Sequence, residues 1–92
     1  MIAYGAMYEL VLTREAQEFY EEADITLAER LNRCFDRLRE SPYKHPNIKR
    51  LKGDLAGLLR YRVGNWRVVY EIDETKKTVT ILLIDHRSNV YE

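Results

Sequence analysis

Three arginines that flank a tight turn are the residues of this sequence best suited to chemistry. Arg60 and Arg62 precede the dipeptide Gly64-Asn65, and Arg67 follows it. The guanidinium group of arginine is planar and presents a fork of N–H donors that matches the oxygens of a phosphate. Three such groups on one surface would bind a phosphate and stabilise negative charge that develops on it during a reaction.

The turn also predicts where these arginines lie. If Gly64-Asn65 is the two-residue turn of a β-hairpin, Arg62 lies opposite Arg67 and Arg60 lies opposite Val69. Alternate residues then point to opposite faces, one apolar and facing the core, the other exposed and carrying the arginines. The predicted core face consists of Leu59, Tyr61, Val63, Trp66, Val68, Tyr70 and Ile72, and the exposed face of Arg60, Arg62, Arg67, Val69 and Glu71.

Charge is balanced overall but segregated along the chain. Fifteen Lys and Arg against fifteen Asp and Glu argue against a nucleic-acid binder that depends on bulk positive charge. However, residues 43–70 carry seven basic and one acidic side chain, a net charge of +6, whereas residues 1–42 and 71–92 have net charges of −4 and −2. Like charges directly opposite one another on a sheet, as Arg62 and Arg67 would be, are destabilising, and a polyanion would relieve that repulsion. The alternative is an ordinary solvated sheet face in which Arg60 pairs diagonally with Glu71.

A second group of reactive side chains follows near the C-terminal end: His86, Arg87 and Tyr91. The sequence has no Ser/His/Asp order, no glycine-rich phosphate loop and no paired-carboxylate spacing, and Asp85-His86 is too little for a metal site. Any catalysis would therefore be metal-free and use Arg, Lys, Tyr or the imidazole, which titrates near neutral pH. Alone, His86 also fits a structural or solvated histidine, and Tyr91 a packing tail.

Length and composition predict one cytoplasmic domain, residues 1–92, with no cofactor. The single cysteine, Cys34, and two distant histidines form neither an internal disulfide nor a Cys/His zinc site. Residues 1–12 have no basic side chain and include Glu9 in their apolar run, so they predict a strand rather than a signal peptide. No stretch approaches the roughly 18 apolar residues of a membrane span.

Hydrophobic patterning predicts a strand followed by two helices. Residues 7–12 are rich in strand formers, and Thr13 then offers an N-cap for the first helix. Thr26 and Glu29 have the spacing of a capping box that opens a second helix. Pro42 ends this helix because its ring disfavours helical geometry in the preceding residue. The two helices should form an antiparallel hairpin.

The second half of the sequence predicts strands. Residues 43–57 contain Pro, Gly and Lys and suit a basic loop interrupted by short extended pieces. Residues 58–63, 66–72 and 78–85 predict a three-stranded antiparallel meander. The expected fold is therefore α+β: an N-terminal strand, an antiparallel helix hairpin and the meander, with the strands in one sheet covered on one face by the helices. The other face must meet solvent or a partner.

Three stretches together resemble a known family: LKGDL at residues 51–55, LRYRVGNWRVVYEI at residues 59–72 and HRSNVY at residues 86–91. The chain resembles the RelE/ParE toxin superfamily, and its RelE branch in particular, over nearly its whole length. The resemblance implies the RelE-like microbial RNase fold and a toxin of a type II toxin–antitoxin pair. RelE-like toxins cleave messenger RNA in the ribosomal A site without a metal, which inhibits translation and arrests growth.

The resemblance also implies roles for individual residues. The 2′-OH of the mRNA attacks the adjacent phosphate and leaves a 2′,3′-cyclic phosphate and a 5′-OH. Arg67 matches the family's transition-state arginine, Arg87 matches an arginine proposed as phosphate ligand or acid, and Arg60 falls where the family has a catalytic lysine. Tyr91 matches the C-terminal tyrosine for which the family implies two roles: stacking on or orienting the substrate base, and assistance of proton transfer.

One position departs from the family pattern. Leu58 stands where a RelE toxin has a second catalytic lysine. Neighbouring basic side chains are expected to supply the missing charge, and His86 is available as a general acid or base. The residues expected to bind RNA or the ribosome are Lys44, Lys49, Arg50, Lys52 and Arg62.

Two other functions stay open on the sequence alone. A ParE-like protein would inhibit DNA gyrase by binding, although that branch generally lacks the arginine and terminal tyrosine constellation. A non-catalytic RNA- or ribosome-binding module would keep the basic surface without the chemistry. The partners implied by the resemblance are mRNA in the ribosomal A site, ribosomal RNA and a cognate antitoxin whose disordered or helical tail folds on the toxin. Contact with DNA is expected only through the antitoxin complex.

Overall fold

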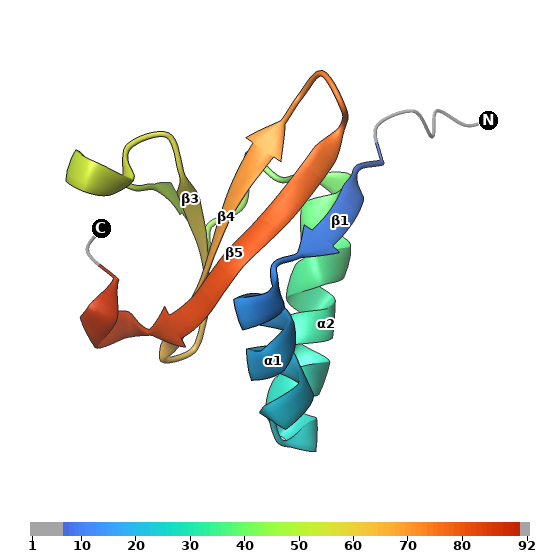
Figure 1. Cartoon of the computed structure of the whole chain (residues 1–92), viewed down its shortest axis with the longest axis vertical. Coiled ribbons are helices and arrows are strands. Elements are labelled where there is room, and N and C mark those ends of the chain that lie inside the picture. Colours follow the sequence, from blue (N-terminus) through green and yellow to red (C-terminus); the bar gives the residue numbers. More distant parts are fainter. Residues whose placement is uncertain (1–6, 91–92) are drawn as a thin grey trace.

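Two helices lie against one face of a five-stranded sheet in the computed structural model, which describes residues 7–90 (Figure 1). This arrangement confirms the predicted α+β class. No helix in this part of the chain is long and apolar enough to cross a membrane. The elements are β1 (Glu9–Leu12), α1 (Arg14–Glu22), α2 (Ile25–Glu40), β2 (Ile48–Arg50), β3 (Leu59–Val63), β4 (Trp66–Asp73) and β5 (Thr78–His86), with short 3₁₀ helices η2 (Gly53–Leu55) and η3 (Arg87–Asn89).

The strands stand in the order β1-β5-β4-β3-β2. β1 runs parallel to β5, and the other neighbouring strands are antiparallel. The predicted meander is β3, β4 and β5, and β2 extends it by an additional edge strand. β2 lies in the predicted basic loop, where the sequence indicated only short extended pieces. Its three residues are too few for the alternating pattern that identifies a strand.

Short polar side chains begin both helices. The hydroxyl of Thr13 caps α1, as predicted. The N-cap of α2 lies two residues before the predicted capping box at Thr26, because the carboxylate of Asp24 already accepts the backbone N–H of Leu27 at 2.8 Å. The predicted start was therefore wrong. The helix is closed by Ser41 as its C-cap, as the following proline predicted.

The helices cover the face of the sheet that the hairpin pattern assigned to the core. Of the seven residues predicted for this face, five are buried and two, Trp66 and Ile72, are half-buried. Leu31 and Leu38 of α2 are completely buried against them. The hydroxyl of Tyr70, in the middle of β4, donates a hydrogen bond to the carbonyl oxygen of Pro42 at 2.6 Å. The strand centre is thereby joined to the end of α2.

A β-bulge adjusts β5 to this core. The register shifts between Val69 and Tyr70 of β4, so that Ile84 and Ile81 of β5 both face the core although they are three residues apart. The hydroxyl of Thr13 donates to the carbonyl oxygen of Leu82 at 2.7 Å. The residue that caps α1 is therefore also bonded to the bulged part of β5.

The opposite face of the sheet has a small apolar cluster of its own. Leu51, Val69 and Val90 are buried there, and Leu55, Leu58 and Leu83 pack against them partly buried. The segment from β2 to β3 and the end of η3 supply the covering side chains. This finding corrects the expectation that the whole face meets solvent or a partner, since its apolar centre is covered by the chain itself. We call these six residues the outer cluster.

Candidate active site

The β3–β4 hairpin brings the predicted arginines to one face of the sheet. Its register is the predicted one, with Arg62 opposite Arg67 and Arg60 opposite Val69. On the other side of β3, Lys49 of β2 lies opposite Arg60. Side chains directly opposite one another share a face, and Val69 places this face on the side of the outer cluster. We call Lys49, Arg60, Arg62 and Arg67 the arginine face.

The turn itself holds one of these guanidinium groups. Gly64 has a φ of +59°, a conformation that residues with a side chain rarely adopt. Nη1 of Arg67 donates to the carbonyl oxygen of Gly64 at 2.9 Å and to that of Trp66 at 3.1 Å. Arg67 is only 8% exposed, so its predicted place on an exposed surface is wrong. The turn carbonyls make the burial possible because they replace water as hydrogen-bond acceptors.

Arg60 is also buried, with 5% of its surface exposed, which again corrects the predicted exposure. Its guanidinium donates to the backbone carbonyl oxygen of Asn47, which also accepts the N–H of Arg62 at 2.9 Å. The loop before β2 is held in turn by the ring of His45, which stacks on Tyr61 with centroids 5.1 Å apart. Asn47 and His45 were absent from the predicted site. Every residue type has a backbone carbonyl, so a hydrogen bond to that group cannot be predicted from the residue types in a sequence.

The segment after β5 brings Arg87 to the same turn. The side chain of Arg87 is exposed at the start of η3, and its backbone N–H donates to the carbonyl oxygen of Asn65 at 2.8 Å. Since Asn65 is a turn residue, Arg87 lies beside the turn that holds the Arg67 guanidinium. Asp85 of β5 lies opposite Arg67 and adds a carboxylate to this part of the face.

His86 lies on the other side of the sheet. It stands opposite Trp66 in the register, and the two rings pack edge to face with centroids 5.7 Å apart. Its Nδ1 accepts the backbone N–H of Ser88 at 3.2 Å, so the neutral ring carries its proton on Nε2. The structure therefore does not bring the imidazole together with the arginine face. Tyr91, the remaining predicted site residue, lies outside the described residues.

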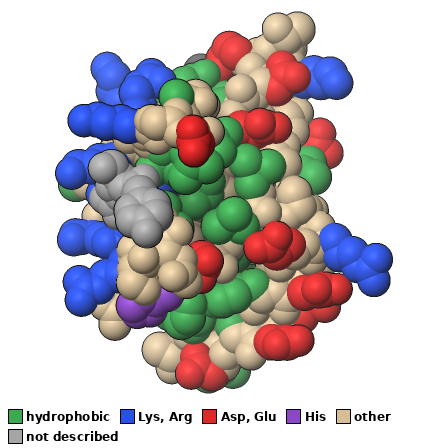
Figure 2. All heavy atoms as spheres, turned by 60° about the vertical axis from the view of Figure 1, so that its left-hand side comes forward, with side chains coloured by type: hydrophobic (Ala, Val, Ile, Leu, Met, Phe, Trp, Pro, Cys, Tyr) green, Lys and Arg blue, Asp and Glu red, His purple; other side chains and the backbone are tan. Residues whose placement is uncertain are grey.

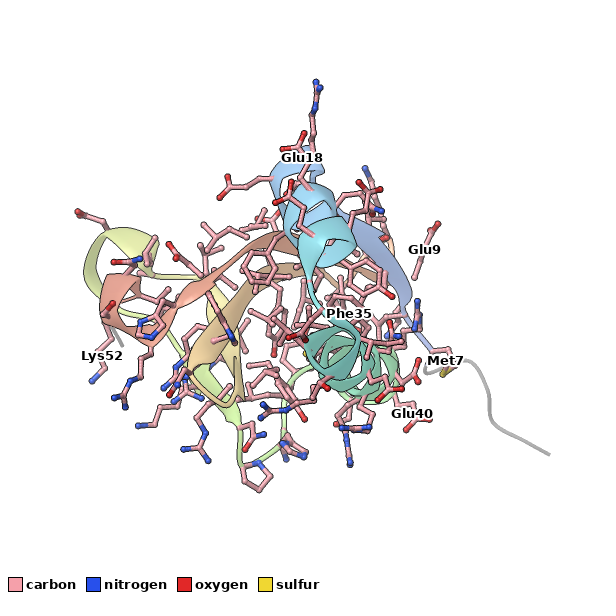
Figure 3. The ribbon with its side chains drawn as sticks, turned by 90° about the horizontal axis from the view of Figure 1, so that it is seen from below. Met7, Glu9, Glu18, Phe35, Glu40 and Lys52 are labelled. Atoms are coloured by element: carbon pink, nitrogen blue, oxygen red, sulfur yellow. The ribbon has the colours of Figure 1, made fainter. Side chains whose placement is uncertain are left out.

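The predicted RNA-binding residues are all exposed and form a basic edge that shares Lys49 and Arg62 with the arginine face. They lie on β2, next to it, or near the end of β3. Figure 2 shows Lys and Arg side chains gathered along one side of the molecule, with most Asp and Glu side chains on the other. Figure 3 shows Lys52 on the far side of the molecule from Met7 and Glu9. This basic edge consists of Lys44, Lys49, Arg50, Lys52 and Arg62.

Leu58, at the position of a family lysine, belongs to the outer cluster and contributes no charge to the face. Within residues 7–90, no group of three His, Cys, Asp or Glu side chains is arranged to hold a metal ion. The side chains that are present can position an anion and stabilise negative charge developing on it. That capacity comes from arginine and lysine.

Comparison with known proteins identifies the family. The family model described as ParE toxin of type II toxin-antitoxin system, parDE, matches residues 10–91. The chain belongs to the RelE/ParE toxin superfamily. The predicted superfamily is thereby confirmed, and the matching family is one of toxins of type II toxin–antitoxin systems.

Individual relatives support the same grouping. Toxin RelG from Mycobacterium tuberculosis is 44% identical over 43 residues, which cover 47% of this chain and 49% of RelG, so the match spans about half of that relative. A chain of the RelBE2 toxin–antitoxin complex from the same organism has 28% identity and a TM-score of 0.76, covering 88% of this chain and 99% of that chain. A chain of the archaeal RelE–RelB complex from Pyrococcus horikoshii shares the fold, with 21% identity, a TM-score of 0.78 and coverage of 91% and 99%.

Proposed function

We propose that this toxin is a ribosome-dependent endonuclease that cleaves messenger RNA in the A site and so inhibits translation. The observation that carries the proposal is the arginine face, on which Arg60 and Arg67 are buried and bonded to backbone carbonyls beside the exposed Arg62. A guanidinium held in place before the substrate arrives needs little reorganisation when negative charge develops on a phosphate. The adjoining basic edge supports contact with a polyanion.

In the proposed reaction the 2′-OH of the mRNA attacks the adjacent phosphorus without a metal. The P–O2′ bond forms and the P–O5′ bond breaks, while a proton leaves the 2′ oxygen and another is delivered to the 5′ oxygen. We assign Arg60 and Arg67 to the phosphate oxygens, Arg87 to phosphate binding or proton donation, and Tyr91 to stacking on the base. No proton-transfer role is assigned to His86, because its ring packs on the core side of the sheet.

A cognate antitoxin is the proposed neutralising partner. By their names, the similar structures of RelBE2 and of the archaeal RelE–RelB are toxin–antitoxin complexes. In this chain, the basic edge is complementary to an acidic peptide. In addition, Phe19, Leu27 and Trp66 line a cavity of about 280 Å³ at the tip of the helix hairpin, which suits an apolar side chain of a partner helix. DNA would be contacted only through such a complex.

Mapping of RNA ends tests the nuclease. The chain is expressed alone, and the 5′ ends of cellular mRNA are located by primer extension. We expect new in-frame ends within translated regions, and none with Arg67→Lys, which keeps the positive charge but loses the guanidinium fork. Arg14→Lys makes the same change at an exposed arginine of α1 and should cleave as the wild type does. Growth arrest without new RNA ends would contradict the proposal.

Inhibition of DNA gyrase is the second candidate, because the matching family model is that of the ParE toxin. Such a toxin would bind gyrase and leave RNA intact. Supercoiling by purified gyrase in the presence of the chain distinguishes the two. Inhibition of supercoiling together with unchanged RNA ends would establish the ParE-like function, whereas ribosome binding with neither activity would leave a non-catalytic binding module.

A further inference from the structure

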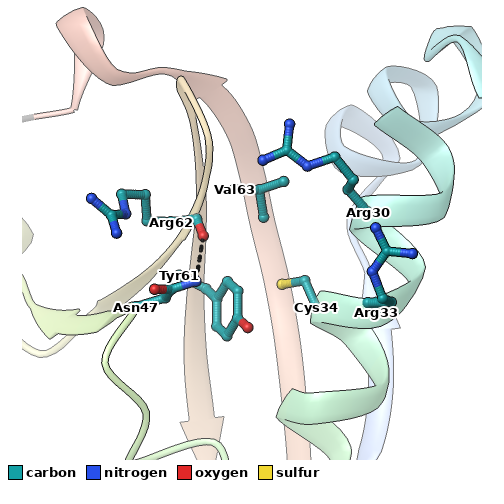
Figure 4. A pocket seen from close by; sticks show the side chains of 7 residues that line it. All are labelled: Arg30, Arg33, Cys34, Asn47, Tyr61, Arg62 and Val63. Carbon is teal, nitrogen blue, oxygen red and sulfur yellow. Dashed lines mark hydrogen bonds between the residues drawn. The ribbon is translucent and has the colours of Figure 1, made fainter. Parts of the chain in front are cut away.

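A polar cavity lies between α2 and β3, on the helix side of the sheet. Its volume is about 140 Å³, which is room for several water molecules at roughly 30 Å³ each. In Figure 4, Cys34 and Tyr61 point into the space between helix and strand, Arg30 extends from α2 toward the strands, and Arg33 lies along the helix at the border of the cavity. The backbone of Arg62 borders the cavity, while its side chain points away from the helix. This cavity is separate from the arginine face.

The positive charge at this cavity is not neutralised within the described part of the chain. Arg30 and Arg33 stand one helical turn apart, so both lie on the same side of α2. The ion pairs formed among residues 7–90 involve other cations, and neither of these two arginines has a carboxylate within pairing distance there. Two arginines of α2 therefore line one polar cavity, and neither is paired with an acid in the described part of the chain.

Arg30 is held against the β3–β4 turn. A Cβ placed on Gly64 would lie 2.9 Å from Nη2 of Arg30, so the guanidinium packs closely on the backbone of the turn. The carbonyl oxygen of the same Gly64 accepts a hydrogen bond from Arg67 at 2.9 Å. One turn thus separates a guanidinium on the helix side of the sheet from a guanidinium on the arginine face. An extended polyanion that crosses this turn would meet both.

The cavity floor offers neither a nucleophile nor a negative charge. Burial raises the pKa of the Cys34 thiol, which is 1% exposed, so the thiol stays protonated and unreactive at neutral pH. Burial also raises the pKa of Tyr61, whose hydroxyl therefore keeps its proton. The cavity combines guanidinium donors with neutral groups, a chemistry suited to binding an oxyanion rather than to transforming it.

We propose that the α2–β3 cavity binds a phosphate of an RNA backbone, as a second anion site beside the arginine face. Arg30 and Arg33 supply forked donors that match phosphate oxygens. RNA is favoured over an acidic peptide because Arg30 packs on the same turn whose Gly64 carbonyl holds Arg67, so a backbone with a phosphate on every nucleotide can reach this cavity and the arginine face together. The inference rests on the proposed function in that RNA is the ligand.

Binding of an uncleavable RNA tests this site separately from catalysis. The probe is a fluorescein-labelled single-stranded oligoribonucleotide with 2′-O-methyl groups, which lacks the 2′-OH nucleophile. Fluorescence anisotropy is measured over a series of salt concentrations. We expect Arg30→Gln/Arg33→Gln to bind about tenfold more weakly and to reduce the slope of log affinity against log salt by about 0.7 for each phosphate that the variant no longer binds. Failure of the wild type to cut mRNA on ribosomes would leave this result unaffected.

The matched control is Arg14→Gln/Arg39→Gln, which removes the same charge from arginines that pair with acids on the helices. Equal reductions of RNA affinity in the two double variants would contradict the proposed site, because they would show that RNA affinity depends only on the net charge of the protein. An Arg30→Gln/Arg33→Gln variant that binds RNA as tightly as the wild type would also contradict the proposed site. If that variant binds RNA normally but binds the antitoxin more weakly, the ligand of the cavity is an acidic peptide. Melting temperatures verify folding, and Arg33→Gln alone replaces the double variant if that variant unfolds.

Discussion

The two faces of the sheet are built from the same hairpin residues in alternation, yet they are closed in different ways. On the helix side, Leu31 and Leu38 of α2 cover strand residues such as Tyr70 until nothing is exposed. On the other side, the described segments that cover Val69 are short, and the buried Arg67 lies beside it. The period of two therefore lets one hairpin provide both the core and the candidate active site.

The difference lies in what replaces water. In the core on the helix side, apolar groups pack against apolar groups, and the hydrophobic effect stabilises their burial. On the arginine face, Arg60 and Arg67 are buried because backbone carbonyls of the loop before β2 and of the β3–β4 turn accept their hydrogen bonds. A carbonyl oxygen has two lone pairs, so the oxygen of Asn47 accepts the guanidinium of Arg60 in addition to the backbone N–H of Arg62. Guanidinium groups can thus be fixed where the sheet ends.

The largest expected effect concerns stability on the two sides. Leu38→Ala removes a completely buried side chain beneath the helices and should reduce the free energy of unfolding by about 2–5 kcal/mol. Leu51→Ala makes the same change in the smaller outer cluster and should lie at or below the lower end of that range, because short covering segments can collapse into the space. Urea unfolding measures both. A larger loss of stability at Leu51 would reverse the assignment of the principal core.

The next effect separates buried from exposed arginine. Arg67→Ala removes the guanidinium that donates hydrogen bonds to the carbonyl oxygens of Gly64 and Trp66, which should reduce the free energy of unfolding by about 1–3 kcal/mol. Arg62→Ala, directly opposite but exposed, should stay within about 0.5 kcal/mol of the wild type. Thermal unfolding of the two variants is compared. Equal stability would show that the carbonyl bonds do not hold Arg67.

A smaller effect on stability is expected at Thr13, whose hydroxyl connects α1 to the β-bulge of β5. Thr13→Ala loses both the N-cap of α1 and the bond to the bulge carbonyl of Leu82, and should cost about 1–2 kcal/mol. Thr13→Ser keeps the hydroxyl and should recover most of that stability. Urea unfolding compares the two variants, and protection of the amides around the bulge in hydrogen exchange locates the change. Similar destabilisation by both would assign the effect to the methyl group instead.

The sequence predicts the arrangement of the hairpin well because one dipeptide determines it. Gly64-Asn65 fixes the turn, the turn fixes the register, and alternation then assigns each side chain to a face, all of which the structure confirms. The cap of α1 at Thr13 follows from equally local chemistry. The failures have non-local causes. Whether Arg60 is exposed depends on a loop that approaches it from thirteen residues earlier in the chain, through a backbone atom that every residue has.

The candidate site is predicted in part for the same reason. The arginines on one face follow from the hairpin, whereas the position of His86 depends on how β5 pairs with β4, which sequence spacing does not determine. The arginines of α2 were not among the predicted site residues, because a helix pattern shows only that Arg30 and Arg33 are polar and outside the apolar stripe. Their meeting with β3 is a tertiary contact. No local signal indicates it.

The smallest effect concerns an acid that lies away from the arginine face. Glu74, in the β4–β5 turn, accepts hydrogen bonds from Lys77, Tyr43 and Tyr8, and these bonds lower its pKa from 4.5 to about 2. A carboxyl whose pKa is lower in the folded state stabilises that state above its unfolded pKa, and the contribution is lost as the pH falls toward the folded pKa. Glu74→Gln should therefore be less stable than the wild type at pH 7.

The difference in free energy of unfolding between wild type and Glu74→Gln should narrow as the pH falls below about 4.5 and be mostly lost by about pH 2. Urea unfolding across this range measures it. Because Glu74 is exposed, the difference should also shrink in high salt. Tyr43→Phe removes a single donor and should show the same pH dependence with a smaller amplitude. If the difference in free energy of unfolding stays constant down to pH 2, the negative charge of Glu74 does not contribute to the stability of the β4–β5 turn.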